Sequence, residues 1–367
     1  TAVTPALVAE FHLSPGQVAW LTMAVQGGFV AGTIVSAVLT LPDVVATRRL
    51  FAIGCVAGAA ATAAITQVDS AGPAIVLRLL TGAALAWVYP TGLKIAAGWF
   101  RGRRGTALAV LVGALTVGQA FPHLLAAVFG STSWRAQLLV TAALAVAGGV
   151  LVVLVVRDGP FDAPAGRFDP RAALLVFRRR ATRLALLGYL GHQWELYAMW
   201  TWVGTFAAAS FAHGGMLQVD RLASAAAFTA VATGAVGCLV AGIAADRRGK
   251  ARVAGWALRT SGSCAALTPL FFGAPPAVVF LFVAVWGLVV VADSAQFSAL
   301  IADYSPPRYV GTALTVETCA GYLLTMMTIR VIPSLTPIVG WQWAFLALVP
   351  GPVLGAWAMR RLQQDGR

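Results

Sequence analysis

The stretch Gly242-Ile-Ala-Ala-Asp246-Arg-Arg-Gly249-Lys250-Ala-Arg252 lies between two long apolar runs, residues 222–245 and 253–270. Gly249 permits a turn, and the small Gly242 lets another helix approach closely. Asp246 comes where the first run ends, and it can pair there with a basic group or with the N-terminus of a neighbouring helix. The stretch therefore predicts a tight, basic connection between two helices at a membrane surface. An ordinary polar loop is the alternative.

The composition of the chain is that of a membrane protein. Hydrophobic residues make up 59% of it and charged residues 11%, and the mean hydropathy is +0.81, whereas a soluble domain carries roughly 25% charged residues. A helix needs about 20 mostly apolar residues to cross a bilayer. Eleven apolar runs fit: residues 15–40, 50–67, 73–99, 104–128, 136–156, 183–211, 222–245, 253–270, 277–302, 309–333 and 339–359. We therefore predict an all-α membrane protein.

Residues 1–10 precede the first run and read as the outer end of an earlier helix. The chain has no initiator Met and no recognisable signal peptide. We expect most of a first helix to lie upstream, so that this chain largely lacks it and the native protein has twelve helices.

The net charge of +13 would suit a nucleic-acid partner if the basic residues formed one patch. They follow the ends of the apolar runs instead. With residues 246–252 in the cytoplasm, 20 of the 26 basic residues fall at cytoplasmic helix ends, and only Arg135 and Arg221 fall in outer loops. This is the positive-inside rule. It predicts a multi-pass protein of a bacterial inner (plasma) membrane with both termini cytoplasmic, and no nucleic-acid partner.

The chain divides into two halves. Residues 157–181 break the apolar pattern with Pro, Gly and charge, so we expect an N-terminal helix bundle over 1–156, a cytoplasmic linker over 157–181 and a C-terminal bundle over 182–367. Gly105-Thr-Ala-Leu108 recurs as Gly311-Thr-Ala-Leu314, 206 residues later, and Asp43 precedes Asp246 by 203 residues. Two matches at nearly the same offset indicate an internal repeat.

The opening stretch resembles the G-x-x-x-D-R-x-G-K/R pattern of the major facilitator superfamily, found between its eighth and ninth helices. Arg78-Leu-Leu-Thr-Gly82 resembles the R-x-x-x-G element of its fourth helix. The resemblance implies two six-helix bundles with pseudo-twofold symmetry and a substrate held between them near the midplane. It implies a role in proton coupling for Arg78. It also implies a gate motif made of Asp43, Gly242, Asp246, Arg247, Gly249 and Lys250.

Some family features are absent from the sequence. In the first copy of the loop motif, Val44 and Ala46 replace Arg and Gly, which predicts a weaker inner gate in the N-terminal half. The antiporter motif of the fifth helix is incomplete, because Pro122 follows Phe121 rather than Gly. This argues against a drug/proton antiporter. Runs 15–40 and 222–245 contain no arginine, which argues against a nitrate or nitrite porter.

Ionisable residues deep in a membrane mark function, because a charge at the bilayer centre costs about 3 kcal/mol or more. Arg78 and Arg330 lie near the outer ends of their runs and Lys94 near an inner end, where long side chains can snorkel. Four groups lie deeper. They are candidates for proton coupling together with Arg78: His192, Glu195, Asp293 and Glu317. Arg259 is a candidate partner for one of the acids.

The run 183–211 is the richest in such residues. Gly188, His192, Glu195, Met199 and Trp202 follow a four-three-four-three spacing and so share one helical face. A carboxyl one turn from an imidazole suits a group that is neutral or charged near neutral pH, as proton coupling requires. A structural His192–Glu195 hydrogen bond is the alternative. No further ligands accompany His192-x-x-Glu195, so we predict no metal site.

We expect the substrate cavity to be lined by Tyr89, Lys94, Tyr197, Trp200, Gln296 and Arg259. The chain has no Ser-His-Asp order at a strand–helix elbow, no Walker loop and no dinucleotide fingerprint, so we predict no enzyme and no cofactor. The favoured function is secondary transport of a small organic solute by alternating access, as a proton-coupled symporter or antiporter and as a monomer. One alternative is proton-driven export of amphipathic or cationic compounds. Another is a sensor or scaffold that has lost transport.

Overall fold

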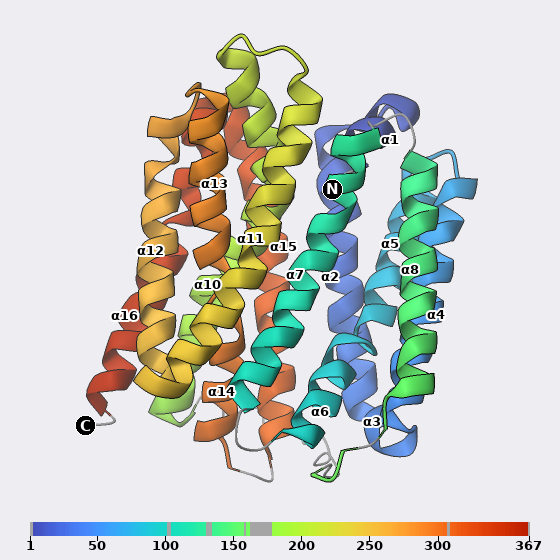
Figure 1. Cartoon of the computed structure of the whole chain (residues 1–367), viewed down its shortest axis with the longest axis vertical. Helices are drawn as coiled ribbons and strands as arrows, with labels where there is room; N and C mark the ends of the chain where they lie inside the picture. Colours follow the sequence, from blue (N-terminus) through green and yellow to red (C-terminus); the bar gives the residue numbers. More distant parts are fainter. Residues whose placement is uncertain are drawn as a thin grey trace.

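Every apolar run of the sequence is mostly helical in the computed structural model of the protein (Figure 1). The structure describes residues 3–100, 104–129, 134–157, 159–161, 178–306 and 309–365, which form helices and turns and no strand. The first half holds α1 (Thr4–Phe11), α2 (Pro15–Val38), α3 (Leu41–Val44), α4 (Thr47–Ala64), η1 (Ile65–Gln67), α5 (Ala71–Leu85), α6 (Tyr89–Trp99), α7 (Arg104–Phe129) and α8 (Trp134–Val155).

The second half stands beside the first in Figure 1, in yellow-green to red. It holds α10 (Arg180–His213), α11 (Val219–Arg248), α12 (Lys250–Phe271), α13 (Pro276–Val290), α14 (Ser294–Tyr304), α15 (Val310–Ala344), η4 (Phe345–Leu348) and α16 (Pro350–Asp365). Gly340 interrupts α15 with φ of 72° and ψ of 167°, so the last predicted run begins at this break. The predicted linker over 157–181 lies mostly outside the described residues.

Five pairs of helices begin at a nearly constant offset, which extends the repeat seen in the sequence. The starts of α2 and α11 are 204 residues apart, those of α4 and α12 203, those of α5 and α13 205, those of α6 and α14 205, and those of α7 and α15 206. The two halves are therefore built on one plan, as the predicted pseudo-twofold symmetry requires.

Two of the predicted runs are broken helices. Residues 73–99 form α5 and α6, with turns over 86–88, and residues 277–302 form α13 and α14, with a break over 291–293. At the first break Pro90 has no N–H to donate to the carbonyl of residue 86, and its ring clashes with a continuous helix. The second break falls at Asp293, a residue type that favours helix ends. The breaks are equivalent positions in the repeat.

Close glycine contacts hold the helices of each half together. A Cβ on Gly82 of α5 would lie 2.0 Å from the carbonyl oxygen of Val25 in α2. A Cβ on Gly287 of α13 would lie 1.6 Å from the carbonyl oxygen of Ala230 in α11. Gly82 and Val25 each lie 205 residues before Gly287 and Ala230. The close crossing of α2 with α5 is therefore repeated in the second half as the crossing of α11 with α13.

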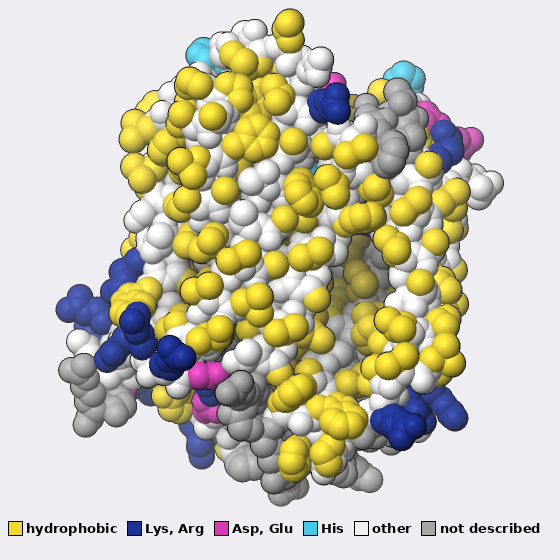
Figure 2. Space-filling view, in the orientation of Figure 1, with side chains coloured by type: hydrophobic (Ala, Val, Ile, Leu, Met, Phe, Trp, Pro, Cys, Tyr) yellow, Lys and Arg dark blue, Asp and Glu magenta, His cyan; other side chains and the backbone are white. Residues whose placement is uncertain are grey.

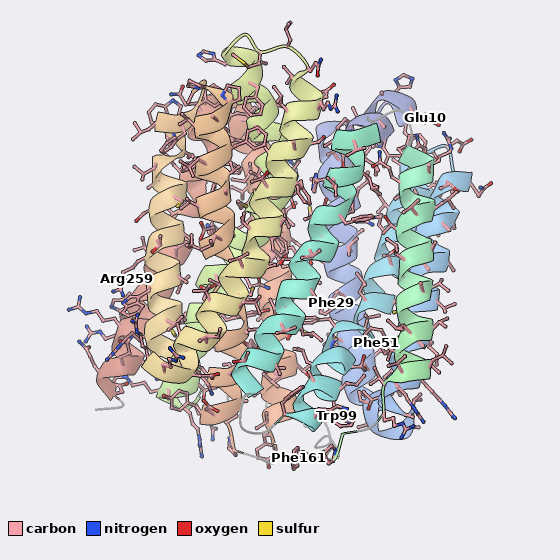
Figure 3. The ribbon with its side chains drawn as sticks, viewed as in Figure 1. Glu10, Phe29, Phe51, Trp99, Phe161 and Arg259 are labelled. Carbon is pink, nitrogen blue, oxygen red and sulfur yellow. The ribbon has the colours of Figure 1, made fainter. Side chains whose placement is uncertain are left out.

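The two halves meet along α7 with α11 and α2 with α15. Gly113 of α7 allows the first contact, since a Cβ there would lie 3.3 Å from the Ala235 carbonyl oxygen. In the second, Phe29 stacks on Tyr322 with ring centroids 4.4 Å apart; Figure 3 labels Phe29 at mid-height of α2. Phe29 and Tyr322 also line a cavity between the halves.

Apolar side chains cover the face between the two ends of the molecule in Figure 2, and most Lys and Arg side chains on this face gather at one end. We call it the basic end; it carries α3, the turn at Gly249 and the C-terminal end of α16. Eight segments of the described chain are long and apolar enough to cross a membrane. Polar residues dilute the hydropathy of α10 and α12, which are not among the eight, and one of the eight segments, Val310–Asp365, takes in two predicted runs. This is a multi-pass membrane protein.

At the opposite end, Glu10 ties α1 to α8. It accepts a hydrogen bond of 2.7 Å from Trp134 Nε1 and pairs with the Arg135 guanidinium, which also lies over the Trp134 ring. Hydrogen bonds from Arg135 and then Trp134 lower the pKa of the Glu10 carboxyl below its ordinary value of 4.5. A carboxyl whose pKa is depressed in the folded state stabilises above its unfolded pKa and loses that contribution as pH falls through its folded pKa.

We therefore expect α1 to be held on α8 at neutral pH and to loosen in acid, at pH values below 4.5. Hydrogen-exchange protection of residues 4–11 should fall there in the unmodified protein. In Glu10→Gln it should be low already at neutral pH. Equal protection in both proteins at neutral pH would contradict this role of Glu10.

Candidate functional site

A cavity of about 140 Å³ lies between the two halves. Its walls come from α2, α5, α7, α10, α11 and α15, together with the first residue of α6. The lining residues are Thr22, Val25, Gln26, Phe29, Arg78, Leu85, Tyr89, Leu115, Gln119, His123, Tyr197, Trp200, Thr201, Val231 and Tyr322. Tyr322 lies 12 residues from the start of α15 at the basic end, about 18 Å along the helix. The cavity is thus near mid-depth.

Aromatic hydroxyls gather on one side of this cavity. The hydroxyls of Tyr197 and Tyr322 are 2.7 Å apart, which joins α10 to α15. Tyr89 stands at the first helix break and lines the same space. Trp200 packs edge-on against Tyr197, with ring centroids 5.5 Å apart. Its Nε1 is buried and has no hydrogen-bond partner among the described residues.

Arg78 brings the one permanent charge in the cavity lining. Its Nε donates a hydrogen bond of 3.2 Å to the carbonyl oxygen of Leu21, which anchors the guanidinium between α5 and α2. Within the described part of the chain, no carboxylate lies within ion-pair distance of it. The cavity is therefore positively charged.

The predicted acids lie outside the cavity lining, buried in the second half. Asp293 sits at the second helix break, and its Oδ1 is 2.8 Å from Nδ1 of His192, with both side chains almost wholly buried. Nε2 of His192 has no partner among the described residues. The pair spans α10 and the α13–α14 break, so it fixes the break against α10.

Glu195 does not contact His192 in the way the helical spacing suggested. Its Oε1 accepts a hydrogen bond of 2.7 Å from Trp286 Nε1 in α13, and its Oε2 accepts one of 2.8 Å from Ser261 Oγ in α12. The face predicted for α10 is buried, but its two ionisable residues turn to different partners. Glu195 therefore has a neutral donor on each carboxyl oxygen.

Glu317 has no such support. Its side chain is wholly buried in α15, and neither carboxyl oxygen has a hydrogen-bond partner among the described residues. The Ser298 hydroxyl of α14 is near enough to interact with the carboxyl, yet it does not reach hydrogen-bond geometry. Glu317 lies five residues closer to the basic end than Tyr322, beneath the aromatic hydroxyls of the cavity.

At the basic end, the motif over residues 242–252 joins the two halves. Thr106 Oγ1 in the first turns of α7 donates a hydrogen bond of 3.0 Å to Asp246 Oδ2, so the α11 carboxylate lies at the N-terminus of α7. Gly249 has φ of 89°, which the predicted turn requires, and Lys250 pairs with Asp303 of α14. Asp43 belongs to α3, and its side chain is not among those the structure describes.

Comparison with known proteins agrees with this architecture. The family model described as the Major Facilitator Superfamily matches residues 1–292, about four-fifths of the chain. The chain belongs to the major facilitator superfamily. Among curated proteins none matches it.

The superfamily fold is also found in a solved structure. A crystal structure of a variant of the E. coli fucose:proton symporter FucP has a TM-score of 0.68 to this chain at 14% identity, and the match covers 98% of this chain and 94% of FucP. At that identity the likeness establishes the fold alone. Membership of this superfamily supports a role in membrane transport.

Three of the six predicted cavity residues, Tyr89, Tyr197 and Trp200, line the cavity, and three do not. Lys94 donates a hydrogen bond of 2.9 Å to the Pro42 carbonyl oxygen at the basic end, because its long side chain reaches toward the surface. Gln296 is buried near the second break. Arg259 faces outward from α12 (Figure 3), so it is neither a lining residue nor a partner for a buried acid.

Sequence reasoning missed several lining residues, including Gln26, Gln119, His123 and Tyr322. Gln119 and His123 are four residues apart in α7, which places them on one face. This four-residue spacing of polar side chains in an apolar run could have indicated that Gln119 and His123 line a cavity. Gln26 stands in an otherwise apolar part of α2, where an isolated amide indicates a polar contact or a cavity.

Proposed function

We propose that this protein is a proton-coupled secondary transporter that moves a small organic solute by alternating access between the halves 1–156 and 182–367, joined by residues 157–181. The observation that carries the proton coupling is the buried Glu317, whose two carboxyl oxygens lack hydrogen-bond partners among the described residues. An ionised carboxylate in that position costs several kcal/mol, on the order of 3 or more, whereas a protonated one does not. The group is therefore neutral in this conformation and takes its proton from water in another.

The orientation we propose puts the basic end in the cytoplasm of a bacterium, following the positive-inside rule. The Thr106–Asp246 contact then lies on the cytoplasmic side of the cavity, where we expect it to act as the inner gate. When the halves rock, this contact breaks and water reaches Glu317, which releases its proton. Asp293, His192 and Glu195 form the polar packing that supports this region.

The alternative of exporting cationic compounds has less support. The acids lie outside the cavity lining, and Arg78 would repel a cation. A protein without transport on the same fold is an outcome of the experiment that follows.

Proton flux in proteoliposomes tests the proposal. The purified protein is reconstituted with a pH-sensitive dye inside the vesicles, and solutes are added one at a time without an imposed gradient. A transported solute should shift the internal pH, and a protonophore should remove the shift. Solute uptake that proceeds without a pH change would contradict proton coupling, and no uptake of any solute would favour the sensor or scaffold.

The gate proposed at Asp246 has its own test. Asp246→Asn keeps an acceptor for Thr106 but removes the charge at the α7 N-terminus, which is worth about 0.3–1 kcal/mol. We expect impaired transport with an unchanged amount of protein in the membrane, and faster labelling of a cysteine placed beneath the contact. Thr106→Val, which removes the donor, should act in the same direction, and Thr106→Ser should not. Unchanged transport kinetics in Asp246→Asn would refute the gate.

A further inference from the structure

We infer that the transported solute is an aromatic monocarboxylate with a single ring, bound with its carboxylate on Arg78 and a hydrogen-bond acceptor on Trp200 Nε1. This inference names the substrate class of the proposed transporter and so rests on that function. The first observation concerns charge: the Arg78 guanidinium in the cavity wall has no carboxylate partner among the described residues. A buried or half-buried arginine is ordinarily paired. A bound carboxylate would supply the missing partner, with charge-assisted hydrogen bonds.

The second observation is the indole N–H of Trp200. The side chain is only 7% exposed, it lines the cavity, and its Nε1 lacks a partner among the described residues. Buried tryptophan N–H groups usually have one. Arg78 belongs to the first half of the chain and Trp200 to the second, so one ligand holding both would join the halves across the cavity, which is what a substrate in alternating access must do.

Size and shape limit what lies between these two groups. The cavity of about 140 Å³ is close to the engineered cavity of about 150 Å³ that binds benzene. Phe29 and Tyr322 are stacked within 17° of parallel and belong to the same wall. A flat ring fits this space and can pack on aromatic faces.

Binding to the purified full chain in detergent tests this, by thermal shift with 4-hydroxybenzoate, benzoate and 4-hydroxybenzamide. We expect 4-hydroxybenzoate to raise the Tm most, benzoate less because it lacks the second acceptor, and the neutral amide not at all. Arg78→Gln should weaken carboxylate binding ten-fold or more. Trp200→Phe should reduce the affinity for 4-hydroxybenzoate to that for benzoate. Arg330→Gln, which changes an exposed arginine outside the cavity, should alter neither.

The Tm without ligand reports whether each variant folds, and Arg78→Lys, which keeps the charge, should retain part of the affinity. If Arg78→Gln does not fold, the comparison of the carboxylate with the amide on the unmodified protein decides. Equal shifts with both compounds, or no shift with either carboxylate, would overturn the inference. A neutral solute that drives proton flux would support proton-coupled transport and contradict a carboxylate as the substrate. Carboxylate binding without proton flux would support the substrate class and contradict proton-coupled transport.

Discussion

Replacing Glu317 by glutamine is expected to abolish solute accumulation driven by a pH gradient while solute exchange continues. The amide has the shape of the protonated carboxyl but cannot release a proton, so the conformational cycle loses its coupling. If one proton moves with each solute, a gradient of about one pH unit supports about ten-fold accumulation. In Glu317→Gln the ratio should fall to about one. Uptake and counterflow measured in the same proteoliposomes separate the two effects.

Glu195→Gln is the matched control, because it makes the same chemical change in a wholly buried acid nearby. The Glu195 oxygens accept from Trp286 and Ser261, so one donor would face the new NH₂ group. We expect a loss of stability of about 1–3 kcal/mol with the pH dependence of accumulation retained. If Glu195→Gln loses that dependence and Glu317→Gln keeps it, the proton site is Glu195.

The contrast between these two acids could not be drawn from the sequence. Helical spacing places His192 and Glu195 on the buried face of α10, but it does not give the partners that other helices bring to that face. Asp293 is 101 residues from His192 in the chain, and Trp286 is 91 residues from Glu195. Which acid remains without a partner depends on such distant contacts. The depth in the membrane that is estimated from the sequence does not distinguish the four ionisable groups from one another.

More of the fold than of the site could be predicted from the sequence, because the fold depends on features that repeat along the chain. Apolar runs long enough to span a bilayer predict the helices, and the recurrence of Gly105-Thr-Ala-Leu108 at Gly311 predicts the two halves. The helix breaks at 86–88 and 291–293 were missed, because hydropathy continues through both. Pro90 and the polar residues from Asp293 onward were the local signals, and their equivalence in the repeat would have strengthened them.

Gly287→Ala should be among the most damaging single changes to the stability of this protein. The new Cβ would lie 1.6 Å from the Ala230 carbonyl oxygen, and a backbone atom in a helix cannot rotate aside as a side chain can. The α11 and α13 helices would have to separate along their whole contact. Overpacking typically costs about 1–3 kcal/mol and occasionally more, and this contact is at the severe end. We expect loss of folded protein or a large fall in Tm by scanning fluorimetry.

Gly118→Ala is the matched control, since a Cβ there meets nothing within 4 Å and the residue lies within a helix. It should be neutral or should stabilise by up to about 1 kcal/mol through helix propensity. Gly82→Ala should behave like Gly287→Ala, because its Cβ would lie 2.0 Å from the Val25 carbonyl oxygen at the equivalent crossing. Gly82 closes the R-x-x-x-G element that begins at Arg78. The glycine of that element then serves helix packing and its arginine serves the cavity, one turn apart on α5. Equal Tm values for Gly82→Ala, Gly287→Ala and Gly118→Ala would contradict the claim that the two close helix crossings require glycine at positions 82 and 287.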